Sequence, residues 1–242
     1  TRITPYVSYV LLSACLLIFF WQVSLGDAVQ QAVYSFGVIP SVLFATKSLP
    51  VELEILPAWL TIFTSMFLHG GWMHLLGNML FLWIFGDNLE DEMGHVPFLL
   101  FYLACGIGAS LAQVVTDPMS QIPTVGASGA IAGVMGGYLL LFPKARVDIF
   151  IFFVVFFRIL PIPAWIMLGL WFAMQLFGGV NTDTSAGGVA YWAHAGGFVI
   201  GLIATLPLWL KRGGMLFWRQ THGHPPHPEA QYRPSNIPRV RR

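Results

Sequence analysis

The stretch Thr124-Val-Gly-Ala-Ser-Gly-Ala-Ile-Ala132 places Ser128 among small residues at the start of an apolar run. A second stretch, Ala193-His194-Ala-Gly-Gly197, places a histidine at the start of another apolar run. A hydroxyl and an imidazole are the minimal groups for nucleophilic acyl transfer. Polar groups inside membrane spans are costly and are usually retained for a function. The two stretches therefore indicate a pair of membrane helices that hold Ser128 and His194 at the same depth.

The composition is typical of a membrane protein. Of the 242 residues, 56% are hydrophobic and 10% are charged, and the mean hydropathy is +0.71. Soluble domains carry about 25% charged residues, so we expect this chain to lie in a lipid bilayer. Basic residues gather in the C-terminal tail and not on a folded face, so no nucleic-acid partner is expected. Cys15 and Cys105 lie in apolar runs, and we expect them to be buried without forming a disulfide.

Six segments are apolar and long enough to be read as transmembrane helices. They lie at about 6–24, 69–86, 96–116, 126–142, 163–178 and 190–210. The apolar segment 149–160 is short and is followed by Pro161 and Pro163. Ser128 and His194 stand near the starts of their spans, so they meet only if an odd number of crossings separates them. One crossing fits the length, and the sequence therefore predicts an all-α membrane protein with six transmembrane helices, in which 149–160 does not cross.

The basic residues predict the orientation of this bundle. Of twelve Lys and Arg residues, all except Lys47 fall on one side of the six-span topology. Because cytoplasmic segments carry the excess of Lys and Arg, we expect cytoplasmic termini and an outer location for the Ser128 and His194 ends. The acidic segment Asp87–Glu92 is predicted to be a cytoplasmic turn, in which Glu90 either braces the inner helix ends or is simply solvated. The compact six-span form favours a bacterial cytoplasmic membrane.

Two further segments have distinctive compositions. Residues 26–68 form a long outer connection rich in apolar side chains, which we expect to lie on or dip into the membrane surface. Residues 211–242 contain five prolines, seven basic residues and one acid, so they cannot bury a core. They are predicted to be a disordered cytoplasmic tail that contacts anionic lipid, following a membrane domain over 1–210. His222, His224 and His227 lie in this tail, where disorder is favoured over metal binding.

Glycines predict how the serine and histidine helices pack. Gly129, Gly133 and Gly137 recur every four residues, and Gly197 and Gly201 lie roughly on the His194 face of the last span. Small residues let membrane helices approach closely, which would bring the Ser128 hydroxyl within hydrogen-bond reach of His194. The alternative is that these glycines serve ordinary helix packing.

The second span carries candidate hydrogen-bond donors. His74 and Asn78 are four residues apart, on one helix face near the outer end. Acyl transfer needs donors directed at the oxygen that becomes negative, and both side chains are suitable. Asn78 alone is also consistent with a hydrogen bond between helices. His69, which precedes this span, is expected to have a structural role.

Together these motifs resemble those of the rhomboid family of intramembrane serine proteases. The matching pieces are Gly126-Ala-Ser128-Gly129, Ala193-His194 followed by Gly197 and Gly201, and His74-x-x-x-Asn78 preceded by His69. Their order matches the family from about residue 7 to residue 210.

The resemblance implies a role for each matching residue. Ser128 would be the nucleophile and His194 the general base of a dyad that has no acidic third member. His74, Asn78 and the Ser128 backbone N–H would form the oxyanion hole. The implied substrates are transmembrane helices of other proteins, partly unwound and cut near their outer ends. No metal or cofactor is implied.

The chain departs from the family pattern at two positions. Some members carry a Trp-Arg pair in the first long loop, whereas Trp59 is followed here by Leu60. Some members have a tyrosine one turn after the nucleophile that stacks on the histidine, whereas this position is Ala132. The orientation of His194 must then come from other neighbours.

Two other classes of function compete with proteolysis. One is a non-catalytic relative that captures membrane helices, and the presence of both Ser128 and His194 argues against it. The other is a transporter or channel for small solutes, which would place polar groups through the whole membrane depth. Here the polar residues gather at the outer ends of three spans.

Overall fold

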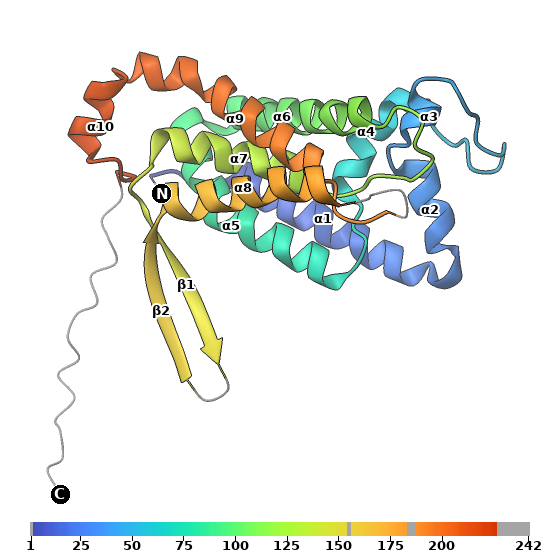
Figure 1. Cartoon of the computed structure of the whole chain (residues 1–242), viewed down its shortest axis with the longest axis horizontal. Coiled ribbons are helices and arrows are strands. Elements are labelled where there is room, and N and C mark those ends of the chain that lie inside the picture. Colours follow the sequence, from blue (N-terminus) through green and yellow to red (C-terminus); the bar gives the residue numbers. More distant parts are fainter. Residues whose placement is uncertain (1, 154–155, 183–186, 227–242) are drawn as a thin grey trace, which may run out of the picture.

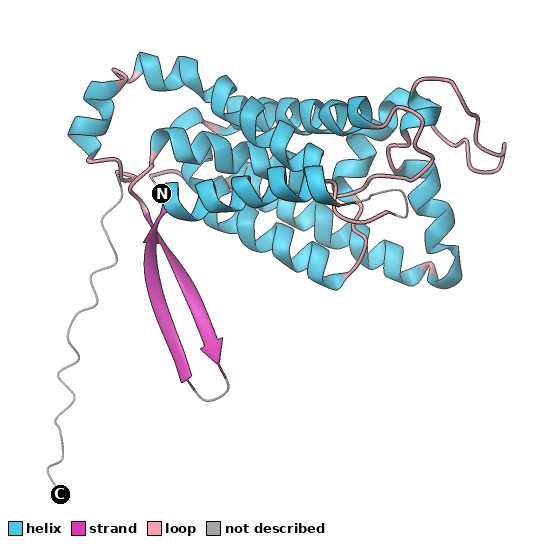
Figure 2. Cartoon of the chain, in the orientation of Figure 1, coloured by secondary structure: helices cyan, strands magenta, loops and turns pink. Residues whose placement is uncertain are grey.

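The computed structural model describes residues 2–153, 156–182 and 187–226, and most of this part is helical (Figure 2). Six long helices lie side by side and form a bundle (Figure 1). They are α1 (Tyr6–Ser24), α5 (Trp72–Met93), α6 (His95–Thr116), α7 (Ser128–Leu141), α8 (Ala164–Asn181) and α9 (Tyr191–Lys211). Each corresponds to one of the six predicted segments, so the helical bundle is confirmed.

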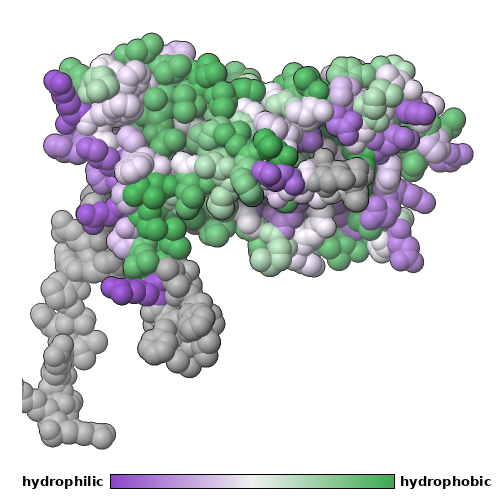
Figure 3. All heavy atoms as spheres, in the orientation of Figure 1, coloured by the Kyte–Doolittle hydropathy of each residue, from purple (hydrophilic) through white to green (hydrophobic). Residues whose placement is uncertain are grey.

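Four of these helices, α1, α6, α8 and α9, are long and apolar enough to cross a bilayer. Of the other two, α7 has only 14 residues, and α5 carries four acidic residues in its last two turns. On the face drawn in Figure 3, hydrophobic residues dominate the middle of the bundle and hydrophilic residues gather toward its ends. The structure is therefore that of an integral membrane protein, while the crossing of the bilayer by all six helices stays a prediction.

The predicted turn at Asp87–Glu92 is wrong, because α5 continues as a helix through these residues to Met93. The turn is made by Gly94, whose φ of 83° favours glycine. The acids are tolerated at the helix end because basic side chains from two other segments neutralise them. Arg2 lies 3.1 Å from Asp91 and 2.7 Å from Glu92, and Arg212 lies 2.8 Å from Glu92.

Glu90 is fully buried at this end of the bundle and braces the start of α1. Its carboxylate accepts hydrogen bonds from the backbone N–H groups of Val7 and Ser8, both at 2.8 Å, and from the Ser8 hydroxyl at 2.7 Å. His95 Nδ1 contacts the same carboxylate at 2.6 Å. A carboxylate from another helix thus satisfies N–H groups of the first turn of α1 that have no partner within the helix. Of the two roles considered for Glu90, this is the bracing role.

Residues 149–153 and 156–160 lie in two paired β-strands, so the fold is not wholly helical. Strands β1 (Arg146–Phe153) and β2 (Phe156–Pro163) pair antiparallel, with Arg146 opposite Pro163, and extend away from the bundle (Figure 1). Isoleucine and phenylalanine favour strands, and the two prolines exclude a regular helix. Within the described residues, α8 is the helix that runs between the helices of Ser128 and His194. That residues 149–160 add no span stays a prediction.

The prediction of disorder from residue 211 onward is wrong for residues 211–226. Met215–Thr221 form the short helix α10. Phe217 is buried there, and Trp218 Nε1 donates a hydrogen bond to the Leu140 carbonyl at 2.9 Å. Phe217 and Trp218 are apolar residues within an otherwise basic segment, and they pack this part of it against the bundle. The remainder of the predicted tail, with His227, lies outside the described residues.

The outer connection folds into short helical pieces at the end of the bundle where α7 begins. These are η1 (Gly26–Ala28), α2 (Val29–Phe36), α3 (Pro40–Leu43), η2 (Ala58–Leu60), α4 (Thr61–Thr64) and η3 (Ser65–Phe67). Val51, Ile55 and Trp59 are exposed in this connection. Contact with the membrane surface stays a prediction.

The closest packing in the bundle is between α7 and α9, as the glycines predicted. A Cβ placed on Gly197 would overlap the backbone of Gly129, and one placed on Gly201 would overlap the backbone of Gly133. The two helices therefore touch backbone to backbone. Cys15 and Cys105 are buried and not bonded to each other, as predicted.

We expect Gly201→Ala to destabilise the protein, because the backbone of Gly133 cannot yield to the added methyl group. Overpacking of this kind costs about 1–3 kcal/mol in the free energy of unfolding. Gly169→Ala in α8 is the matched control, since a Cβ there meets no atom within 4 Å. Denaturant unfolding in detergent measures the difference in stability between the two variants. Equal stability would contradict the backbone-to-backbone contact of α7 and α9, which we call the glycine seam.

Glu90→Ala is expected to lower the free energy of unfolding by about 3–5 kcal/mol, because it strands several buried donors. Glu90→Gln keeps an acceptor and is expected to cost less. Asp27→Asn, at an exposed acid of the outer connection, serves as the control. The Tm of each of the three variants, measured by thermal unfolding, ranks their stabilities. A wild-type Tm for Glu90→Ala would exclude the bracing role.

Candidate active site

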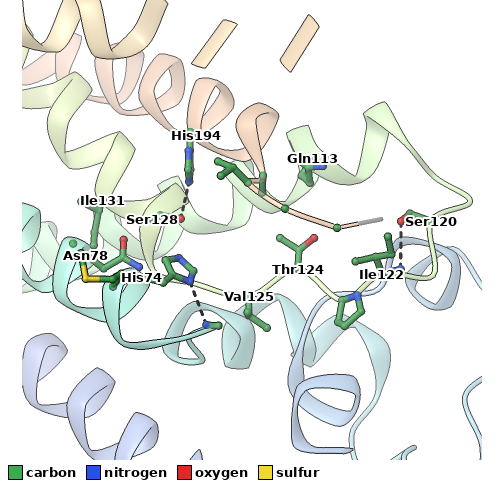
Figure 4. Close-up of a pocket in the computed structure, with 18 of the residues that line it drawn as sticks. His74, Asn78, Gln113, Ser120, Ile122, Thr124, Val125, Ser128, Ile131 and His194 are labelled. Atoms are coloured by element: carbon green, nitrogen blue, oxygen red, sulfur yellow. Dashed lines mark hydrogen bonds between the residues drawn. The ribbon is translucent and has the colours of Figure 1, made fainter. Parts of the chain in front are cut away.

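Ser128 and His194 meet at one end of the bundle. Ser128 is the first residue of α7 and His194 lies in the first turn of α9. The Ser128 Oγ and His194 Nε2 atoms are 2.8 Å apart, within hydrogen-bond distance (Figure 4). The predicted contact between these two side chains is therefore present, and the α7–α9 glycine seam is what allows it.

Helix α8 supplies the other neighbours of the His194 ring. Gln175 Oε1 lies 2.8 Å from His194 Nδ1, and the Trp171 ring lies 5.9 Å from the imidazole between centroids, with the planes at 33°. These contacts hold the ring at one edge and one face, in line with the expectation that residues other than Ala132 orient His194. The sequence interpretation missed both residues, although a glutamine inside an apolar span is itself a signal of function.

The start of α9 is also held by α6. Gln113 Oε1 accepts a hydrogen bond from the backbone N–H of Ala193 at 3.2 Å. The N–H groups of a first helical turn have no partner within the helix, so a side-chain acceptor fixes the turn that carries His194. Gln113 is a second polar residue in an apolar span that the sequence interpretation missed.

His74 lies beside Ser128 with a defined ring orientation. Its Nδ1 accepts a hydrogen bond from the Gly70 N–H at 3.2 Å, so in the neutral ring the proton is on Nε2. A Cβ placed on Gly126 would lie 2.6 Å from His74 Cε1, 2.7 Å from its Nε2 and 3.5 Å from Ser128 Oγ. Gly126 also has a φ of 129°, so both space and backbone conformation require glycine there.

Asn78 lies one turn after His74 on α5. Together with His74, Ser128 and His194 it lines one cavity (Figure 4). Its side chain is 6% exposed. Its Nδ2 has no hydrogen-bond partner among the described residues. A buried donor without a partner is costly, so this amide is available to an acceptor that enters the cavity.

His69 is placed to hold His74 from behind. Gln22 in α1 fixes the His69 backbone twice, accepting from its N–H at 2.9 Å and donating to its carbonyl at 3.2 Å. The His69 and His74 rings pack edge to face with centroids 5.2 Å apart. This geometry agrees with the structural role expected for His69, and Gln22 is a further residue that the sequence interpretation missed.

The segment that leads into Ser128 is pinned to the outer connection. Val38 and Thr124 exchange backbone hydrogen bonds of 3.0 and 2.8 Å, and the Gly126 N–H donates to the Ser65 carbonyl at 2.8 Å. The outer connection therefore fixes the approach to α7.

A cavity of about 610 Å³ opens over the Ser128–His194 pair. Its lining includes both apolar side chains of α5, α7 and α8 and polar groups that end or follow α6. The apolar side chains include Met73, Phe81, Ile131, Met135 and Trp171, and the polar groups include Gln113, Asp117, Ser120 and Thr124. The volume is within the usual range of ligand sites, about 300–1,000 Å³. Within residues 2–153, 156–182 and 187–226, no three His, Cys, Asp or Glu side chains gather as metal ligands would.

Comparisons with known proteins place the chain in a family. The rhomboid domain family matches residues 57–211. Rhomboid protein 1, mitochondrial, of Saccharomyces cerevisiae is 30% identical over 167 residues, covering 66% of this chain and 45% of that protein. Rhomboid protease GluP of Bacillus subtilis is 30% identical over 215 residues, covering 87% of this chain and 36% of that protein.

A plant relative matches a shorter region. Rhomboid-like protein 11, chloroplastic, of Arabidopsis thaliana is 43% identical over 77 residues, covering 32% of this chain and 27% of that protein. In all three relatives the matched region is less than half of the relative's own length. The family match spans more than half of this chain and includes Ser128 and His194. The chain therefore belongs to the rhomboid family.

Proposed function

We propose that this protein is an intramembrane serine endopeptidase that cuts transmembrane helices of other proteins near their outer ends. The observation that carries the proposal is the 2.8 Å contact between Ser128 Oγ and His194 Nε2 beneath a cavity in a membrane bundle. A serine is a weak nucleophile until an adjacent base accepts its proton. His194 is the base in reach of this serine.

In the proposed reaction His194 Nε2 takes the Ser128 hydroxyl proton as Oγ attacks the carbonyl carbon of the peptide bond. The carbonyl oxygen becomes negative in the tetrahedral intermediate. His194 then gives its proton to the amine nitrogen as the C–N bond breaks, and the acyl group stays on Oγ. A water molecule, deprotonated by His194, attacks this ester, releases the carboxylate and restores the Ser128 hydroxyl.

The negative oxygen would be held by three donors. Asn78 Nδ2 is buried and has no partner among the described residues, and the His74 Nε2–H lies beside Gly126 and Ser128. The Ser128 backbone N–H is at the start of α7, where the helix offers no acceptor and its dipole favours negative charge. Fixed donors of this kind stabilise the transition state more than the substrate.

Two features favour a transmembrane helix, partly unwound at the cleaved peptide bond, as the substrate: the depth of Ser128 and the lining of the cavity. At about 1.5 Å per residue the 14 residues of α7 span about 21 Å, less than the roughly 30 Å of a bilayer core. Ser128 would then lie below the outer surface of the membrane. Apolar side chains of the cavity suit the substrate's apolar residues, and its polar side chains suit the water that the second step consumes.

Orientation and location follow the charge pattern. Arg2, Lys144 and Lys211 lie at the end of the bundle away from Ser128, which favours cytoplasmic termini. We propose a bacterial cytoplasmic membrane. The matched relatives include bacterial, mitochondrial and chloroplastic proteins, so fractionation of the native cell is the test.

Ser128→Ala and His194→Ala are each expected to abolish cleavage of a model transmembrane helix and labelling by a fluorophosphonate probe. Loss of a dyad member lowers kcat by about 10⁴-fold or more in serine proteases. Ser24→Ala, at an exposed serine of α1, is the matched control and should label as the wild type does. Labelling that survives in Ser128→Ala would place the reactive group elsewhere, and helix binding without any cleavage would favour a non-catalytic helix-capturing protein.

Asn78→Ala is expected to lower kcat by about 10²–10³-fold with KM unchanged, because the lost donor acts on the oxygen only in the transition state. Asn181→Ala, at an exposed asparagine near the end of α8, is the control. Steady-state cleavage in detergent measures both constants. A rise in KM at constant kcat would instead assign Asn78 to substrate binding.

A further inference from the structure

Gln175 is a buried polar residue of α8, and both the oxygen and the nitrogen of its side-chain amide have a hydrogen-bond partner. The side chain is 8% exposed. Its Oε1 lies 2.8 Å from His194 Nδ1, and its Nε2 donates to the Trp171 carbonyl at 3.3 Å. Trp171 also packs on the imidazole, so one turn of α8 defines both the face and the edge of the ring.

The hydrogen bonds determine which nitrogen of His194 carries the proton. The Trp171 carbonyl can only accept, so the Gln175 group that faces it must be the NH₂. The Gln175 group that faces His194 is then the carbonyl oxygen, which also can only accept. Nδ1 of the neutral ring must therefore be the protonated nitrogen. Nε2 is left as the acceptor for the Ser128 hydroxyl, which is the state that a general base requires.

We propose that Gln175 is a positioning residue that holds His194 in its catalytic tautomer and rotamer. The inference rests on the proposed function of Ser128 and His194. An acidic residue in this place would also offset the charge of the protonated imidazole, whereas the Gln175 amide contributes orientation and a dipole only. Besides His194, the titratable side chains that line the cavity within the described residues are His74 on α5 and Asp117 after α6.

Three variants separate orientation from packing. Gln175→Met keeps the length and volume of the side chain but removes the acceptor. Gln175→Glu restores an acceptor and adds a negative charge. Met174→Ala changes a residue of the same helix that is 52% exposed, and it is the control for general effects on α8. The thermal unfolding of each variant is measured beside its activity.

We expect Gln175→Met to lower kcat for Ser128-dependent cleavage by about 10²-fold with KM unchanged, because the base is no longer held in the right tautomer. Gln175→Glu should recover most of this loss. Its carboxylate favours the protonated, inactive imidazole, so the acid limb of the pH–rate profile should move to higher pH. Wild-type kcat and pH profile in Gln175→Met would overturn the proposal, as would a Gln175→Glu variant no more active than Gln175→Met.

A readout that needs no activity completes the test. In ¹⁵N-histidine-labelled protein, with His194→Ala used to assign the signal, we expect His194 to be protonated on Nδ1 and not on Nε2. Gln175→Met should lose this preference, and protonation on Nε2 in the wild type would overturn the inference. If the wild type shows no Ser128-dependent cleavage, the proposed protease function fails while this measurement still decides the role of Gln175.

Discussion

The backbone contact between α7 and α9 is the constraint on which the rest of the site depends. Gly197 and Gly201 lie against Gly129 and Gly133 so closely that no Cβ fits at either crossing. In a bilayer there is no hydrophobic drive to bring two helices together, so close packing of small residues supplies the attraction. The Ser128–His194 hydrogen bond of 2.8 Å is a consequence of this seam, because both residues stand in the first turn of their helices.

The polar groups around the site form two series of contacts, one on each side of Ser128 and His194. Gln22 fixes His69, His69 packs on His74, and His74 lies against Gly126 and Ser128. On the other side the Trp171 carbonyl fixes Gln175, and Gln175 fixes His194. Buried polar groups are costly unless they are paired, so each contact also stabilises the fold. The unpaired Asn78 Nδ2 stands out among the described residues because it faces the cavity.

The opposite end of the bundle is held by charge instead of small residues. Glu90 caps α1, and Arg2 and Arg212 pair with the acids at the end of α5. These contacts join the first, second and last of the long helices. They also explain how an acidic helix end is accommodated on a side of the protein that is otherwise basic.

Local signals in the sequence were enough to predict the six helical segments and the close packing of α7 and α9, because hydrophobic runs and glycine spacing can be recognised without the fold. Costly polar residues in apolar runs likewise singled out Ser128, His194, His74 and Asn78 as candidates for the site. The continuation of α5 through Asp87–Glu92 and the folding of α10 could be seen only in the tertiary structure, since each depends on partners distant in the chain. The strands β1 and β2 pair with each other, and a short apolar run leaves strand and helix open until that pairing is known. The contacts of Gln175, Gln113 and Gln22 were likewise visible only in the tertiary structure. A glutamine in an apolar span signals that it has a partner, but only the packing of the helices shows which atom that partner is.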